Sequence, residues 1–164
     1  MQIVLSWFEV YRAAECGAMR QIEALKRGRP HRYGTPPQDE WGVHIEACGA
    51  EMAVAKAYNL YWEPVARNPE KLAGDVADLQ VRSTWRENGR LILHDPKDAN
   101  DAVFVLVTGR LPTFTVRGWI TGANGKQQRY WDEGDGRSAY FVPQSALCQE
   151  QPPIGGKVLP FKTA

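Results

Sequence analysis

A short run of acidic, amide and basic residues, from Asp75 to Arg82, holds the side chains best suited to bind a metal ion. Asp78, Gln80 and Arg82 alternate with apolar residues, and alternate residues of a strand project from the same face. Carboxylate oxygens are hard ligands for metal ions, so the candidate chemistry of this segment is a carboxylate-centred metal site. The pattern also leaves open an ordinary, half-exposed edge strand.

Glu51 is the candidate acid on a different element. Apolar residues recur at helical intervals from Ile45 to Ala55, which predicts a helix from Trp41 to Tyr61. Glu51 falls beside this apolar stripe, so we expect its carboxylate to be partly buried at the rim of the core.

The sequence has none of the common motifs for nucleotide binding, acyl transfer or zinc binding. Motifs for nucleotide binding (Walker A, G-x-G-x-x-G) and for acyl transfer (G-x-S-x-G) are absent, and the three His and three Cys show no zinc spacing. Unpaired cysteines, the lack of a signal-peptide pattern and the lack of an apolar run of ~18 residues predict a cytoplasmic protein without membrane contact. The formal net charge of +1 means that any DNA-binding surface must come from local clustering.

The first element that the sequence predicts is a long helix, Trp7 to Lys26. Ser6 and Glu9 match a capping box at its start, and a glycine and a proline follow its end. The apolar stripe that we expect to face the core consists of Trp7, Val10, Ala14, Ala18, Ile22 and Leu25.

Strands are predicted after Asp75. The alternating segment ends near Ser83, and an Asn88–Gly89 turn signal joins it to Arg90–His94, which predicts a β-hairpin. The continuous apolar run Ala102–Thr108 predicts a central strand that is covered on both faces.

Further strands are predicted at Phe114–Ile120 and Arg137–Val142. Together these elements predict one α/β domain over residues 1–148, with a mixed central β-sheet flanked by helices. Residues 149–164 form a tail rich in Pro and Gly.

Two of these segments resemble the motifs of a known family: Gly49 to Lys56 (GAEMAVAK) and Gly74 to Thr84 (GDVADLQVRST). The PD-(D/E)XK nuclease superfamily has its motifs in this order: an acid on a helix, then an Asp, and then an acid-x-Lys pair on a strand. The resemblance covers about residues 41–121 and is closest to small nuclease-like proteins of phages. It implies a restriction-endonuclease-like core with an added N-terminal helix, which hydrolyses DNA with Mg²⁺ or Mn²⁺ in the cytoplasm, and in the host's cytoplasm if a phage encodes it.

Residue by residue, the resemblance implies that Glu51, Asp75, Gln80 and Arg82 are the catalytic residues. Asp75, Glu51 and Gln80 would hold the metal. Asp78 has no fixed counterpart in the family, but its direction from the strand places it next to Gln80, where it could replace or supplement Asp75. Gln80 replaces the family's second acid and brings no charge. Arg82 replaces the lysine, so it can stabilise a charged transition state but cannot act as a base.

Several cationic and hydroxyl side chains are candidates for contacts with DNA phosphates, with a solvated surface as the alternative. They are Arg27, Arg29 and Arg32 in the loop after the first helix, with Lys56, Ser83 and Thr84. Later in the chain, basic residues interleave with aromatic ones, a pattern that suits single strands or splayed ends; they are Arg110, Arg117 and Arg129, with Trp119, Tyr130 and Trp131. The alternative is that the tryptophans pack in the core or on a sheet face, which the sequence favours for Trp119 and leaves open for Trp131.

Three hypotheses follow. The first is a Mg²⁺-dependent nuclease. The second is a nuclease fold that has lost catalysis and acts as a nucleic-acid-binding or assembly protein, and the third is an unrelated α/β interaction domain. We also expect a homodimer, because cutting both strands favours two active sites and two-fold symmetry is common.

Overall fold

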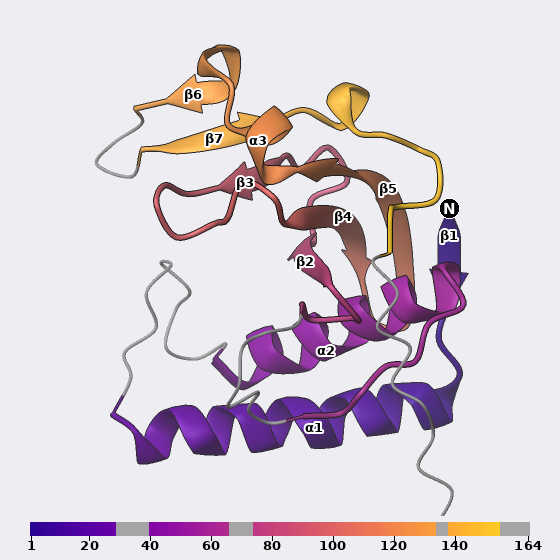
Figure 1. Ribbon diagram of the computed structural model, residues 1–164. Helices are drawn as coiled ribbons and strands as arrows, with labels where there is room; N and C mark the ends of the chain where they lie inside the picture. The colour runs from indigo at the N-terminus through magenta and orange to yellow at the C-terminus, as the bar shows by residue number, and fades with distance from the viewer. Residues whose placement is uncertain (29–39, 66–73, 134–137, 155–164) are drawn as a thin grey trace, which may run out of the picture.

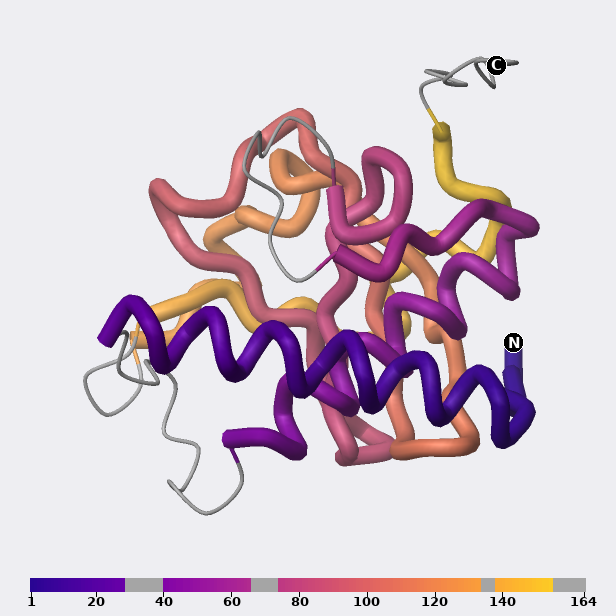
Figure 2. Tube along the Cα trace, turned by 90° about the horizontal axis from the view of Figure 1, so that it is seen from below, coloured from indigo at the N-terminus to yellow at the C-terminus, as the bar shows by residue number. Residues whose placement is uncertain are grey.

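The computed structural model describes residues 1–28, 40–65, 74–133 and 138–154, arranged in layers (Figure 1). Two helices cover one face of a mixed four-stranded sheet, and a smaller antiparallel sheet packs on the other face. Helix α1 lies outermost and α2 lies between α1 and the sheet, as Figures 1 and 2 both show. The predicted α/β class with a mixed sheet is confirmed.

Helix α1 (Trp7–Lys26) has the predicted bounds and the predicted start. The Ser6 hydroxyl accepts a hydrogen bond from the Glu9 amide at 3.3 Å, and the Glu9 carboxylate accepts one from the Ser6 amide at 2.6 Å. This reciprocal pair satisfies amide groups that have no partner within the first helical turn.

The buried side of α1 is not the side that the sequence predicts. Its buried residues are Ala13, Cys16, Gly17 and Gln21. A Cβ on Gly17 would lie 2.5 Å from the Cα of Ile45, so the backbones of α1 and α2 are in close contact there. The predicted core stripe is right only in part. Val10 packs against the core, but Trp7, Ile22 and Leu25 are exposed, because small residues allow the helices to approach and the large ones are left outside.

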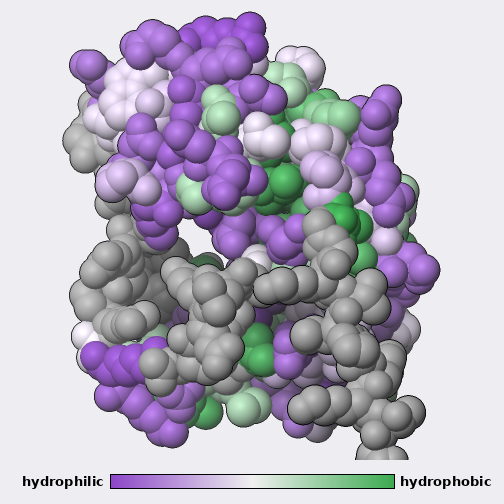
Figure 3. All heavy atoms as spheres, viewed as in Figure 1, coloured by the Kyte–Doolittle hydropathy of each residue, from purple (hydrophilic) through white to green (hydrophobic). Residues whose placement is uncertain are grey.

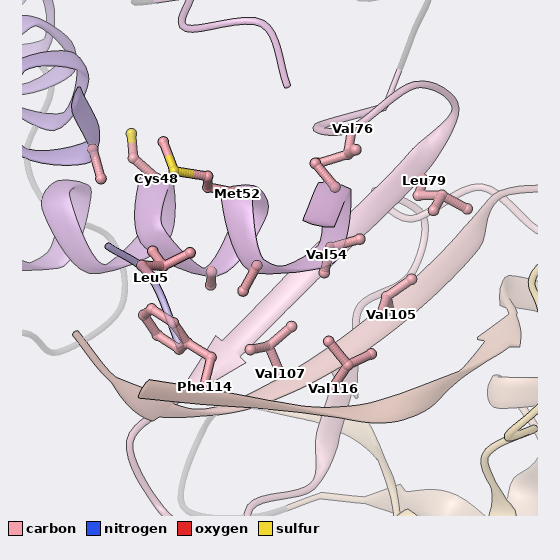
Figure 4. Packing of buried hydrophobic residues seen from close by; sticks show 14 of the residues in the cluster. Leu5, Cys48, Met52, Val54, Val76, Leu79, Val105, Val107, Phe114 and Val116 are labelled. Atoms are coloured by element: carbon pink, nitrogen blue, oxygen red, sulfur yellow. The ribbon is translucent and has the colours of Figure 1, made fainter. Parts of the chain in front are cut away.

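Helix α2 (Glu40–Ala57) begins one residue earlier and ends four residues earlier than predicted. Every residue from Cys48 to Ala55 is buried, because α1 covers one side of this half and the sheet covers the other. Figure 4 shows Cys48 and Met52 on the side of α2 away from the sheet, and Val54 on the side toward Val105.

The mixed sheet has the strand order β1-β5-β4-β2. The strands are β1 (Gln2–Val4), β5 (Thr113–Thr121), β4 (Val103–Arg110) and β2 (Leu79–Thr84). Strand β2 is parallel to β4, whereas the β4–β5 and β5–β1 pairs are antiparallel. The first six residues of β4 are buried, which confirms the predicted central strand.

The smaller sheet has the order β3-β7-β6. Its strands are β3 (Leu91–Leu93), β7 (Ala139–Val142) and β6 (Trp131–Asp132), and the short helix α3 (Gly122–Gly125) follows β5. The predicted hairpin after β2 is wrong, because β2 pairs with β4 and β3 pairs with β7. A two-residue hairpin turn of type I′ needs positive φ at both central residues, and neither Asn88 nor Gly89 has one.

Alternate side chains of β4 enter two separate cores. Val103, Val105 and Val107 pack on the side of the mixed sheet that α2 covers, here called the helix side. Phe104 and Leu106 pack with residues of β3 and β7 on the opposite side, here called the small-sheet side. These two sides fix the direction of each β2 side chain, because residues paired across a ladder point the same way.

The last described segment returns to the mixed sheet. Trp119 and Cys148 exchange backbone hydrogen bonds of 3.0 and 2.8 Å. The predicted tail beyond residue 154 lies outside the described residues. In the part of the chain that is described, none of the helices combines the length and the apolar character needed to cross a bilayer.

Candidate functional site

The Glu51 carboxylate lies between the two helices and is almost fully buried, at 5% exposure. Arg20 donates two hydrogen bonds to it, at 2.6 and 2.8 Å, and the Trp62 indole donates a third at 3.2 Å. Burial raises the pKa of Glu51 above its usual value against the lowering effect of Arg20, and the charge of Asp75 raises it further. The predicted burial is therefore confirmed, and the carboxylate is already satisfied by protein donors.

Asp75 lies in the tight turn that leads into β2. Its carboxylate accepts a hydrogen bond from the Val81 amide at 2.8 Å, and its own amide donates to the Leu79 carbonyl at 2.7 Å. A Cβ on Gly74 would lie 2.2 Å from the Leu79 carbonyl oxygen, so only glycine fits this approach. Asp75 thus has a structural role at the start of β2.

The remaining motif residues do not all lie on one strand face. Asp78 precedes β2, which begins at Leu79, and it is exposed in the turn. Gln80 pairs with Phe104 and Arg82 with Leu106 across the ladder, so both point to the small-sheet side. Glu51 belongs to the helix side. The structure brings Glu51 and Asp75 within electrostatic influence of each other, and it separates Gln80 and Arg82 from them.

Arg82 has partners of its own on the small-sheet side. Its guanidinium donates a hydrogen bond of 2.8 Å to Asp98 and lies 5.1 Å from the centre of the Phe104 ring. Asp98 is buried, at 5% exposure, and also accepts a 2.8 Å hydrogen bond from the His94 amide. Sequence reasoning missed Asp98; its signal was the Asp-Pro-Lys-Asp turn directly after His94.

This arrangement does not fit the implied Mg²⁺. Within residues 1–28, 40–65, 74–133 and 138–154, no three His, Cys, Asp or Glu side chains gather closely enough to hold a metal ion. Both oxygens of Glu51 accept hydrogen bonds from Arg20, one oxygen of Asp75 accepts from Val81, and Gln80 lies across the sheet. A hard divalent cation needs several free oxygens directed at one point.

The predicted phosphate-binding residues are dispersed. Arg27 pairs with Glu23 at 3.3 Å, and Lys56 pairs with Glu9 at 3.0 Å. Ser83 and Thr84 end β2. Arg29 and Arg32 lie outside the described residues.

The later basic and aromatic residues are also spread over the molecule. Trp119, Arg129 and Tyr130 line a recess of about 600 Å³ beside β5. Arg117 donates a 2.7 Å hydrogen bond to the Thr108 hydroxyl, and the Trp131 ring packs on Tyr140.

Trp85 and two arginines form a cluster that sequence reasoning did not bring together. Trp85 directly follows β2 and is 62% exposed. The guanidinium groups of Arg86 and Arg110 each lie 5.4 Å from the centre of its ring. Arg110 ends β4, which is parallel to β2, so the ladder brings the carboxyl ends of both strands to one edge. In the sequence, the signal for this cluster is the Trp85–Arg86 pair directly after the alternating segment.

Comparisons with family models, with curated proteins and with solved structures give no match for this chain. Its resemblance to the PD-(D/E)XK superfamily therefore rests on the quoted motifs alone.

Proposed function

We propose that this protein binds single-stranded DNA without a metal ion, on a core related to PD-(D/E)XK nucleases that has lost catalysis. The observation that carries the proposal is the Trp85 cluster, an exposed indole with Arg86 and Arg110 beside it. An exposed aromatic ring next to cations can stack a base and bind its phosphates, without regard to sequence.

The position of the cluster supports the proposal. In α/β proteins, ligands bind beyond the carboxyl ends of the parallel strands, and β2 and β4 both end here. A cation–π contact at an exposed site contributes only about 0.5–1 kcal/mol. A base can therefore replace one guanidinium at the indole, and the released guanidinium is then able to bind a phosphate.

The charges and hydrogen-bond partners of the motif residues support the proposed loss of catalysis. Arg20 neutralises Glu51, Gln80 carries no charge, and Arg82 is bonded to Asp98. The nuclease-like core is supported by the order of its elements, with the acid-bearing α2 followed by Asp75 and β2.

The test is the fluorescence anisotropy of a labelled single strand, titrated with protein in EDTA and again in Mg²⁺. We expect binding in EDTA that Mg²⁺ does not strengthen, because added cations compete for the phosphates. Trp85→Ala should bind about tenfold more weakly, because each stacked base contributes about 1–3 kcal/mol. Trp41→Ala is the matched control, since Trp41 is another exposed tryptophan, on α2. Equal affinities of Trp85→Ala and wild type would refute the proposal.

The same samples test the nuclease hypothesis. Gel analysis after incubation with Mg²⁺ or Mn²⁺ would show product if the chain cuts DNA. Cleavage that is lost in Asp75→Asn would replace our proposal with the nuclease.

A further inference from the structure

The outer side of α1 is an apolar surface with no partner among the described residues. Six large side chains of this helix are between 42% and 76% exposed: Trp7, Phe8, Tyr11, Met19, Ile22 and Leu25. Together they are called the α1 stripe. Figure 2 shows α1 across the front of the molecule, and Figure 3 shows apolar atoms among the hydrophilic ones along the lower edge, where α1 lies.

The α1 stripe is unusual because the same helix also has a buried side. A surface helix normally has one apolar side toward the core and a polar side toward water. Here α1 contacts α2 through small residues such as Ala13 and Gly17, and the aromatic residues point outward. A contiguous exposed patch of this kind marks an interaction site.

We propose that the α1 stripe is the contact surface of a homodimer, in which two copies of α1 pack antiparallel. The first argument is the spacing along the helix. Phe8, Tyr11, Glu15, Met19 and Ile22 follow at intervals of 3, 4, 4 and 3 residues, which places them on one side and makes the series symmetric about Glu15.

A two-fold axis at Glu15 therefore matches four residues of the α1 stripe, Phe8, Tyr11, Met19 and Ile22, to the same four residues of a second copy. Phe8 of one copy lies opposite Ile22 of the other, and Tyr11 lies opposite Met19. The aromatic half of each helix meets the aliphatic half of its partner. Such self-complementarity is what an isologous two-fold interface requires.

The charges near the axis also fit a second copy. Arg12 and Glu15 form an exposed ion pair at 2.9 Å, with side-chain exposures of 43% and 46%. In the antiparallel arrangement, Arg12 of each copy comes beside Glu15 of the other. The two Glu15 carboxylates at the axis are then flanked by two guanidinium groups, which offsets their repulsion.

The area is sufficient for a weak, specific dimer. A fully buried aromatic side chain contributes about 150–250 Å², so the α1 stripe offers on the order of 600 Å² per copy at its observed exposure. A two-fold pair would bury about 1,200 Å², at the lower limit for specific interfaces.

The experiment is sedimentation equilibrium of the full chain over a range of concentrations. We expect a mass that rises with concentration from 18.4 kDa toward twice that value. Ile22→Glu should hold the chain at the monomer mass. Val43→Glu, the same kind of change at an exposed apolar residue of α2, should dimerise like wild type.

A charge reversal tests the orientation. Arg12→Glu and Glu15→Arg alone should each weaken the dimer at least tenfold, and the double reversal should restore it. A wild-type chain that stays monomeric at every concentration overturns the proposal. So does a dimer that Ile22→Glu leaves intact, or a monomer whose α1 stripe instead binds lipid vesicles.

Discussion

Arg20 on α1 and Glu51 on α2 form a bidentate ion pair, with hydrogen bonds of 2.6 and 2.8 Å, in the contact between the two helices. Glu51 is the residue that the nuclease motif would assign to a metal ion. Instead, the guanidinium of Arg20 donates hydrogen bonds to both oxygens of this carboxylate. In this fold, therefore, Glu51 links α2 to α1.

Removing the arginine should destabilise the protein in a pH-dependent way. Arg20→Met leaves a buried carboxylate without its cation, and we expect a loss of about 3–5 kcal/mol at neutral pH. The pKa of Glu51 is already raised in the folded chain, and the substitution raises it further. Between the unfolded and folded pKa values the folded state binds more protons, so its stability falls as the pH rises.

Urea unfolding at neutral pH and at a pH below the ordinary pKa of 4.5 checks this prediction. The loss should be smaller in acid, where Glu51 is protonated in both states. Arg27→Met, which breaks an exposed pair on the same helix, should change stability by less than about 1 kcal/mol at either pH. An equal loss at both pH values for Arg20→Met would contradict the prediction.

The contact between α1 and α2 should not accept a methyl group at Gly17. The new Cβ would meet the Ile45 backbone at 2.5 Å, and backbone cannot move aside as a side chain can. We expect Gly17→Ala to lose about 1–3 kcal/mol from overpacking, in spite of a helix-propensity gain of about 1 kcal/mol. Thermal unfolding measures it, and Lys26→Ala at an exposed position is the control.

Asp98 should anchor the segment between β3 and β4. Asp98→Ala removes the acceptor of both Arg82 and the His94 amide, and we expect a cost of about 1–3 kcal/mol for each group left without a partner. A double-mutant cycle with Arg82→Met should give a coupling energy of about 0.5–3 kcal/mol. Additive losses would mean that the two side chains act independently.

Divalent metal should leave stability unchanged. A ligand that binds the folded state raises its unfolding free energy in proportion to the logarithm of its concentration, so Mg²⁺ titration followed by the Tm is a direct test. We expect no shift with Mg²⁺ and none with EDTA. A rise in Tm that Asp75→Asn abolishes would show that the acids rearrange around a metal ion.

The Trp85 cluster should supply part of the salt dependence of DNA binding. Each phosphate contact contributes to the slope of log K against log salt. On a single strand each contact contributes about 0.7, so replacing both Arg86 and Arg110 with Gln should reduce that slope by about 1.4. Arg129→Gln is the matched control, because Arg129 also lies over an aromatic ring, 4.8 Å from the centre of Tyr130.

Local signals in the sequence predicted the local structure well. The Ser6–Glu9 capping box and the apolar run of β4 were read correctly because each depends on a few neighbouring residues. The buried side of α1 was not, because the close approach at Gly17 depends on the backbone of a second helix. Apolar periodicity finds a helix with large residues on one side, but it does not say which side meets the core.

The predicted site residues do not lie together in the structure, and the reason is similar. Alternation correctly put Gln80 and Arg82 on one face, but which face they share depends on the pairing of β2 with β4. That pairing joins segments that are distant in the sequence. Because β2 pairs with β4 and β3 pairs with β7, the predicted hairpin of β2 with β3 does not form. The partners Arg20 and Asp98 come from distant segments, so no spacing rule near residues 75–82 could reveal them.

The hydrogen bond between Asp75 and the Val81 amide also bears on whether a further strand can add to the mixed sheet. Strand β2 is at one end of the mixed sheet, and the unpaired amides of an end strand invite strands of other chains to add on. The Asp75 carboxylate accepts a hydrogen bond from one such amide, that of Val81. It also places a negative charge at the edge where another strand would have to pair. The acid that matches the motif aspartate would then oppose the addition of another strand at this end of the sheet.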